Sequence, residues 1–162
     1  QCSTDRDQLK ALNDMLQAAK PHWASFNSDT AKEVLAAGDV AAGMIFNGYA
    51  AKARETRETL KYAYPKQGWV NWMDSVVLLK DAPNRENALK FMDFLLEPEN
   101  IAQVTNFARY TDVIEGTAEY IDPELASMHE SNPPAGIEGV FVEACNAETQ
   151  AVYDKIWTNL KK

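Results

Sequence analysis

Apolar residues near the start of the chain recur at intervals of three or four, which is the spacing of one face of an amphipathic helix. This stripe consists of Leu9, Leu12, Leu16 and Ala19. Thr4 or Asp5 can cap the helix through a side-chain oxygen, and Pro21 ends it. The pattern therefore predicts a helix that buries one face.

Six further helices are predicted from caps, apolar spacing and proline positions. The second can be capped by Ser28 or Asp29 and ends at Gly38, a residue type common just past helix ends. The others cover residues 49–56, 84–96, 99–107, a short stretch from Asp122, and the end of the chain from about Asn146. In the last helix, the residues predicted to be buried are Val152, Ile156, Trp157 and Leu160.

Short apolar runs between these helices predict strands. Residues 40–46 form an uninterrupted apolar run, which is typical of a strand buried on both faces. Residues 60–64 and 69–79 are further strand candidates. Helices interleaved with short apolar strands predict an α/β fold. The strands are few for so many helices, so we expect part of the sheet to be supplied from outside this chain.

Composition restricts the classes of function. The chain has 162 residues, 46% of them hydrophobic and 25% charged, as in an ordinary globular protein. Its net charge of −8 argues against a nucleic-acid partner, which would need a basic patch. No apolar run approaches the roughly 20 residues that cross a bilayer. The opening residues do not have the pattern of a signal peptide, and a mature product, a truncated product or a cytoplasmic protein would all look this way.

Cysteine and histidine residues give no indication of a metal centre. Cys2 and Cys145 are far apart, as are His22 and His129, and neither pair has the spacing of a metal site. The two cysteines could form a disulfide in an oxidising compartment or remain two unrelated thiols. No phosphate loop or nucleophile motif is present, so we expect neither a cofactor nor an enzyme.

The run from Trp69 to Ser75 contains the candidate chemistry. If this run is extended, Trp72 and Asp74 lie on one face, because strand side chains alternate. An aromatic ring beside a carboxylate suits an organic cation, which the ring face attracts and the carboxylate binds by a charge-assisted hydrogen bond. The alternative interpretation is a core tryptophan next to an aspartate that caps a turn.

Four segments, in register, resemble the periplasmic spermidine/putrescine-binding proteins of bacterial ABC importers. They are Phe26-Asn27-Ser28-Asp29, Gly43-Met44-Ile45-Phe46-Asn47-Gly48, Trp72-Met73-Asp74-Ser75, and the helix from Asn87 to Glu99. The resemblance covers essentially the whole chain, but it matches only the C-terminal half of that family. It implies a periplasmic binding protein type II-like fold with two α/β lobes and a ligand cleft between them.

The resemblance also implies a division of the chain between the lobes. Residues 1–73 would belong to the second, C-terminal lobe. Residues 74–118 would return to the first lobe, and residues 119–162 would complete the second lobe with the C-terminal helix. The partners would be the missing N-terminal half of the same protein and a membrane ABC permease, in the periplasm of a Gram-negative bacterium.

Five residues are implied to contact the ligand. Trp72 and Asp74 match the family's Trp-x-Asp and would stack on and bind an amine. Phe46 stands where the family has a tryptophan, Tyr110 aligns with a family tyrosine, and Glu143 falls near a family glutamine. The implied function is capture of a polyamine such as putrescine or spermidine for import. The alternatives are another organic cation or small solute or, from a different class, a carboxylate-based hydrolase.

Overall fold

The computed structural model describes residues 2–162, which divide into two compact units. Unit 1 contains residues 2–28, 70–72 and 139–162, and unit 2 contains residues 29–69 and 73–138. These units are not the two predicted lobes, which would also contain residues from outside this chain. The predicted division of the chain at residues 73 and 118 therefore stays a prediction.

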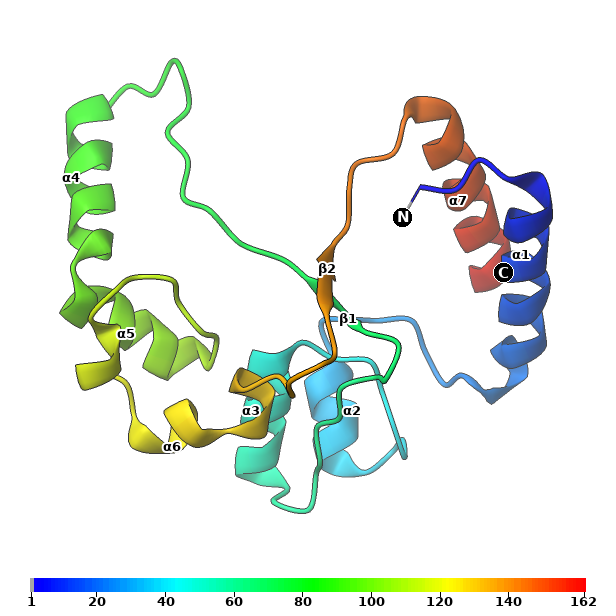
Figure 1. Cartoon of the computed structure of the whole chain (residues 1–162), viewed down its shortest axis with the longest axis horizontal. Coiled ribbons are helices and arrows are strands. Elements are labelled where there is room, and N and C mark those ends of the chain that lie inside the picture. The colour runs from blue at the N-terminus through cyan, green and yellow to red at the C-terminus, as the bar shows by residue number, and fades with distance from the viewer. Residues whose placement is uncertain (1) are drawn as a thin grey trace. The chain divides into compact units, whose positions relative to one another are not determined.

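Unit 1 is built from two long helices, α1 (Arg6–Ala19) and α7 (Ala147–Lys161), which pack side by side (Figure 1). The side chain of Asp5 accepts hydrogen bonds from the N–H groups of Asp7 and Gln8, and Asn146 caps α7 in the same way through Thr149. A short 3-10 helix, η1 (Lys20–His22), follows α1 and contains Pro21. The first and last helices are therefore confirmed, with Asp5 as the cap of α1.

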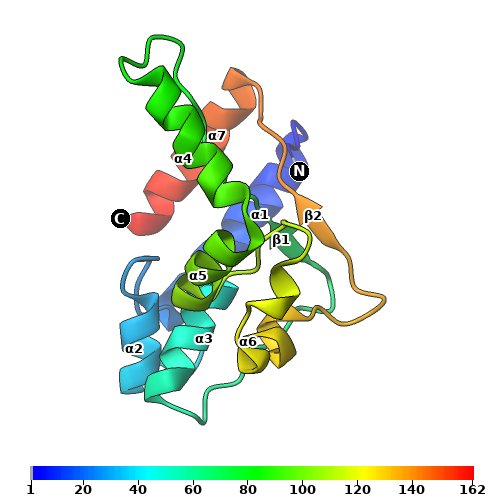
Figure 2. The ribbon, with the colours of Figure 1, turned by 90° about the vertical axis from the view of Figure 1, so that its left-hand side faces the viewer.

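The helices of unit 2 follow the predicted order: α2 (Ala31–Ala37), α3 (Asn47–Thr56), α4 (Arg85–Leu96), α5 (Pro98–Ala108) and α6 (Pro123–Ser127), with 3-10 turns η2 (Thr117–Glu119) and η3 (His129–Ser131). Helix α2 lies beside α3, as Figures 1 and 2 both show. Gly38 ends α2 in the left-handed conformation at φ 84°, as its residue type indicated. The predicted caps of α2 are wrong, because the helix begins after Thr30 rather than after Ser28 or Asp29.

The strand predictions were largely wrong. Within residues 2–162 the sheet has two strands, β1 (Trp69–Asn71) and β2 (Gly139–Phe141), which pair with each other. Residues 40–46 and 60–64 form no strand, and Met44 is fully exposed. A strand exists only when a neighbour takes up its N–H and C=O groups, and the described residues provide no such neighbour for these segments.

The predicted apolar faces are only partly buried. Leu9 of α1 and Leu160 of α7 form the core of unit 1, but Val152 and Trp157 are exposed rather than buried. Trp23, Phe26 and Trp157 instead form a chain of edge-to-face contacts with ring centroids 5.2 Å apart. In unit 2, α3 buries Ala51 and Ala53, whereas α4 buries no residue and exposes Leu89, Phe91, Phe94 and Leu96.

No helix in the described part of the chain is both long and apolar enough to span a bilayer.

Candidate functional site

The start of α3 packs against the residue that follows the end of α5. A Cβ atom placed on Gly48 would lie 2.8 Å from Cζ of Tyr110 and 2.9 Å from the carbonyl oxygen of Ala108. Only a glycine therefore lets the Tyr110 ring rest on the first turn of α3. Arg109 ends α5 in the left-handed conformation at φ 65°, and its N–H donates to the carbonyl of Thr105. That turn brings Tyr110 back toward α3.

Three aromatic rings gather at this contact, and we call Phe46, Tyr49 and Tyr110 the aromatic corner. The ring centroid of Tyr49 lies 6.2 Å from that of Phe46 and 6.3 Å from that of Tyr110. Phe46 is 43% exposed, so its ring is accessible to a solute. Tyr49 follows Phe46 by three residues, which places the two rings on the same side of the helix start. The Phe46 ring is thus open to a cation, whereas Lys32 Nζ already lies 5.4 Å from the centroid of the Tyr49 ring.

Asp74 brings negative charge to the aromatic corner. The pKa of Tyr110 is raised above its ordinary value, first by burial and then by the charges of Tyr49 and Asp74. A carboxylate close enough to affect the Tyr110 hydroxyl also attracts a cation placed against the rings. Ring faces together with a nearby carboxylate can bind an organic ammonium group.

A buried polar cluster also contacts α3. Glu130 of η3 is almost fully buried and forms an ion pair with Arg54 of α3. The backbone carbonyl of Glu130 accepts hydrogen bonds from Tyr64 Oη at 2.8 Å and from Asn47 Nδ2 at 3.4 Å. Asn47 lies between Phe46 and Gly48, so this cluster positions the segment that carries the aromatic corner.

The predicted site residues fall in both units. Phe46, Asp74 and Tyr110 are in unit 2, where electrostatic and ring contacts bring them into one neighbourhood. Trp72 and Glu143 are exposed residues of unit 1. The ligand roles of all five residues stay predictions.

Three features were missed or left open by sequence reasoning. Tyr49 was missed, although its spacing from Phe46 was a usable signal, whereas nothing in the sequence marks Glu130 as a buried residue. The open question of the cysteines is answered by a disulfide between Cys2 and Cys145. Within residues 2–162, no group of three or more His, Cys, Asp or Glu side chains is arranged to hold a metal ion.

Comparison with known proteins gives a consistent result. The sequence model of the family described as bacterial extracellular solute-binding protein matches residues 4–131. The spermidine/putrescine-binding periplasmic protein of Salmonella typhimurium is 30% identical over 161 residues, covering 98% of this chain and 46% of the relative. Its namesake in Escherichia coli K12 is 34% identical over 133 residues, covering 82% of this chain and 38% of the relative.

A relative with a different printed ligand is also similar. The putrescine/cadaverine-binding protein of Pseudomonas aeruginosa is 26% identical over 169 residues, covering 98% of this chain and 47% of the relative. The chain thus spans at most about half the length of these relatives.

Proposed function

The chain belongs to the family of bacterial extracellular solute-binding proteins, and from this premise we propose that it is the C-terminal half of a receptor for a polyamine. The intact receptor captures putrescine, spermidine or a similar cation and delivers it to an ABC permease. It binds its ligand and does not transform it. The observation that supports this proposal is the aromatic corner, in which three rings gather and Asp74 contributes to the raised pKa of Tyr110.

The chemistry of a polyamine fits these groups. An ammonium group is costly to remove from water unless a carboxylate pairs with it, and Asp74 supplies that charge. The methylene groups gain about 0.8 kcal/mol each when they are buried against rings such as Phe46 and Tyr110. In the proposed receptor, Trp72 provides a further ring face and Glu143 a second carboxylate.

A missing N-terminal half explains the exposed apolar surface of unit 2. Helix α4 exposes Leu89, Phe91, Phe94 and Leu96, and the preceding segment exposes Val76, Val77 and Leu79. So many exposed large apolar side chains in one region of the sequence indicate surface that is covered in the intact protein. We assign residues 74–118 to the first lobe of a two-lobe α/β fold, in which the other half of the protein covers these side chains.

The proposed location is the periplasm. The disulfide between Cys2 and Cys145 is stable in an oxidising compartment, and the relatives described above include periplasmic proteins. Ligand contacts from both lobes would favour a closed state of the receptor, which the permease recognises.

Isothermal titration calorimetry on the intact receptor tests the proposal. We expect putrescine or spermidine to bind with a Kd in the micromolar range or below. Asp74→Asn should weaken binding about 10- to 100-fold, because it removes a charge-assisted hydrogen bond. Asp14→Asn is the matched control, since it changes the net charge equally on the exposed surface of α1 and should leave Kd unchanged. Absence of binding heat with every polyamine tested would refute the proposal.

A further inference from the structure

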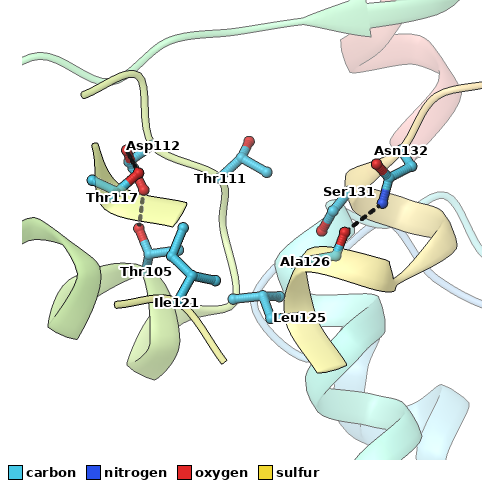
Figure 3. A pocket seen from close by; sticks show the side chains of 9 residues that line it. All are labelled: Thr105, Thr111, Asp112, Thr117, Ile121, Leu125, Ala126, Ser131 and Asn132. Carbon is cyan, nitrogen blue, oxygen red and sulfur yellow. Dashed lines mark hydrogen bonds between the residues drawn. The ribbon is translucent and has the colours of Figure 1, made fainter. Parts of the chain in front are cut away.

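Unit 2 contains a hollow of about 230 Å³ whose lining includes no residue of the aromatic corner. Its walls come from the end of α5, the loop that follows it, α6 and η3, and are formed by Thr105, Thr111, Asp112, Thr117, Ile121, Leu125, Ala126, Ser131 and Asn132 (Figure 3). The volume is below the 300–1,000 Å³ of sites for drug-sized molecules, so any ligand must be smaller.

One wall of the hollow holds a rigidly oriented carboxylate. Asp112 Oδ1 accepts hydrogen bonds from the N–H of Ile114 and from Thr117 Oγ1, both at 3.0 Å. Asp112 Oδ2 accepts one from Thr105 Oγ1 at 2.9 Å. Thr105 and Thr117 are only 4% and 6% exposed, and the single hydroxyl hydrogen of Thr117 is shared between Asp112 Oδ1 and the carbonyl of Ile114 at 3.1 Å. An ionised carboxylate can accept about four hydrogen bonds, which leaves room on Oδ2 for one more donor.

The opposite wall holds a hydroxyl that no described group satisfies. Ser131 Oγ is buried and has no hydrogen-bond partner among the described residues. The neighbouring Asn132 side chain is fixed, because its Nδ2 donates to the carbonyls of Ala126 and Met128. Figure 3 shows Asp112 on one side and Ser131 on the other, with Leu125 and Ile121 between them. A buried polar group without a partner is unfavourable, and a ligand in the hollow would relieve that cost.

We propose that this hollow is a second binding site and that it takes a short amino alcohol. The ammonium group of the ligand donates to Asp112 Oδ2. Its methylene groups lie over Ile121 and Leu125, and its hydroxyl bonds Ser131 Oγ. A cation is favoured because Asp112 is the only charged residue among the nine that line the hollow. A purely structural role for Asp112 would explain the hydrogen bond that Oδ1 accepts from the N–H of Ile114, which stabilises the turn. It would not explain why Ser131 Oγ has no partner among the described residues or why the hollow is present.

Three small probes of similar size test the site by NMR titration of the intact protein that carries this chain. Ethanolamine has both polar ends, n-propylamine lacks the hydroxyl, and ethylene glycol lacks the charge. We expect ethanolamine to bind about 3- to 10-fold more tightly than n-propylamine, the ratio given by one neutral hydrogen bond. Ethylene glycol should produce no saturable shift.

Variants connect the selectivity to individual residues. Ser131→Ala should abolish the preference for ethanolamine over n-propylamine while leaving stability unchanged or slightly higher, because it removes an unsatisfied hydroxyl. Ser127→Ala is the matched control, since that exposed hydroxyl bonds the carbonyl of Glu124 outside the hollow and should not alter the preference. Asp112→Asn should weaken both amines at least 10-fold.

The two proposals can fail separately. Equal binding of ethanolamine and n-propylamine by the unaltered protein, or an unchanged preference in Ser131→Ala, would overturn the second site even if Asp112→Asn failed to fold. Putrescine also carries ammonium groups, so variants separate the two sites in calorimetry: Asp74→Asn should weaken its micromolar binding, whereas Ser131→Ala should leave that binding unchanged.

Discussion

In unit 1 both long helices begin at a side chain that accepts hydrogen bonds from their first N–H groups, Asp5 for α1 and Asn146 for α7. In the described part of unit 2, none of the five α-helices has such a side-chain cap. Unit 2 instead contains the long-range ion pairs of Glu130 with Arg54 and of Arg109 with Glu55. Unit 1 thus depends on local signals and a covalent link, whereas unit 2 depends on contacts between residues far apart in the sequence.

The largest effect that separates the units should come from the disulfide. Cys2 and Cys145 are 143 positions apart, and closing a loop of that length stabilises a protein by up to about 5 kcal/mol. We expect the double variant Cys2→Ser with Cys145→Ser to lose most of that amount in urea denaturation. The loss should appear first in the fluorescence of Trp23 and Trp157, which lie in unit 1.

Reduction of the unaltered protein with dithiothreitol provides the control for this prediction. It should reproduce the destabilisation without any substitution and should have no effect on the double variant. If reduction left the unfolding midpoint unchanged, the covalent link would not be what stabilises unit 1.

The next effect tests the buried ion pair of unit 2. The side chain of Glu130 is 1% exposed, and Arg54→Met would leave its carboxylate buried without a partner charge, at a cost of about 3–5 kcal/mol. Lys10→Met breaks the exposed Lys10–Asp14 pair of unit 1 and is the contrasting substitution, with no measurable loss expected. A double variant, Arg54→Met with Glu130→Leu, should recover part of the loss, because it removes the unpaired charge as well.

Helices could be predicted from sequence because their signals are local. Gly38, Pro98 and the cap at Asp5 act within a few residues of where they stand, and the structure places helix ends at each of them. Strands could not be predicted in the same way. The apolar run at 40–46 has the composition of a strand, but a strand needs a partner. The small number of strand candidates indicated that part of the sheet lies outside this chain, but it could not show which segments would therefore remain unpaired.

The residues of the candidate site also differ in whether local sequence signals could identify them. Asp74 was proposed from its position two residues after Trp72 and Phe46 from the resemblance to the family, and Tyr49 was within reach of a spacing argument. The contact of Gly48 with Tyr110 joins two segments that only the tertiary structure brings together. Glu130 was not predictable at all, because glutamate is almost always exposed and no local pattern distinguishes a buried one.

A smaller effect would test whether that long-range contact organises the aromatic corner. Gly48→Ala places a Cβ within 3 Å of both the Tyr110 ring and the backbone of Ala108, which should cost about 1–3 kcal/mol in spite of the better helix propensity of alanine. Gly43→Ala is the matched control, because its Cβ would meet only the flexible Leu35 side chain at 3.3 Å. Equal stability of the two variants would show that the ring does not rest on α3.

Tyr64 allows a test by pH. Burial, then the charges of Tyr62 and Glu130, raise the pKa of Tyr64 from 10.0 to about 12. Below pH 10 the phenol is protonated in both the folded and unfolded states, so Tyr64 makes its full contribution to the free energy of unfolding. Between pH 10 and 12 only the unfolded state ionises, so stability should fall across that window. The decrease in the free energy of unfolding should be smaller in Tyr64→Phe. This variant should also be about 1 kcal/mol less stable at neutral pH, because it lacks the hydrogen bond to the carbonyl of Glu130.

The smallest effect compares one cap in each unit. Asn146→Ala removes the side-chain oxygen that accepts from the N–H of Thr149 at 2.8 Å, and caps of this kind contribute about 1 kcal/mol. Thr30→Ala alters the residue before α2, whose side chain makes no capping bond, so the loss should be only a few tenths of a kcal/mol. Chemical denaturation of both variants measures the difference. If Thr30→Ala cost as much as Asn146→Ala, helix starts in unit 2 would depend on local signals after all, and the contrast between the units would reduce to the disulfide and the buried ion pair.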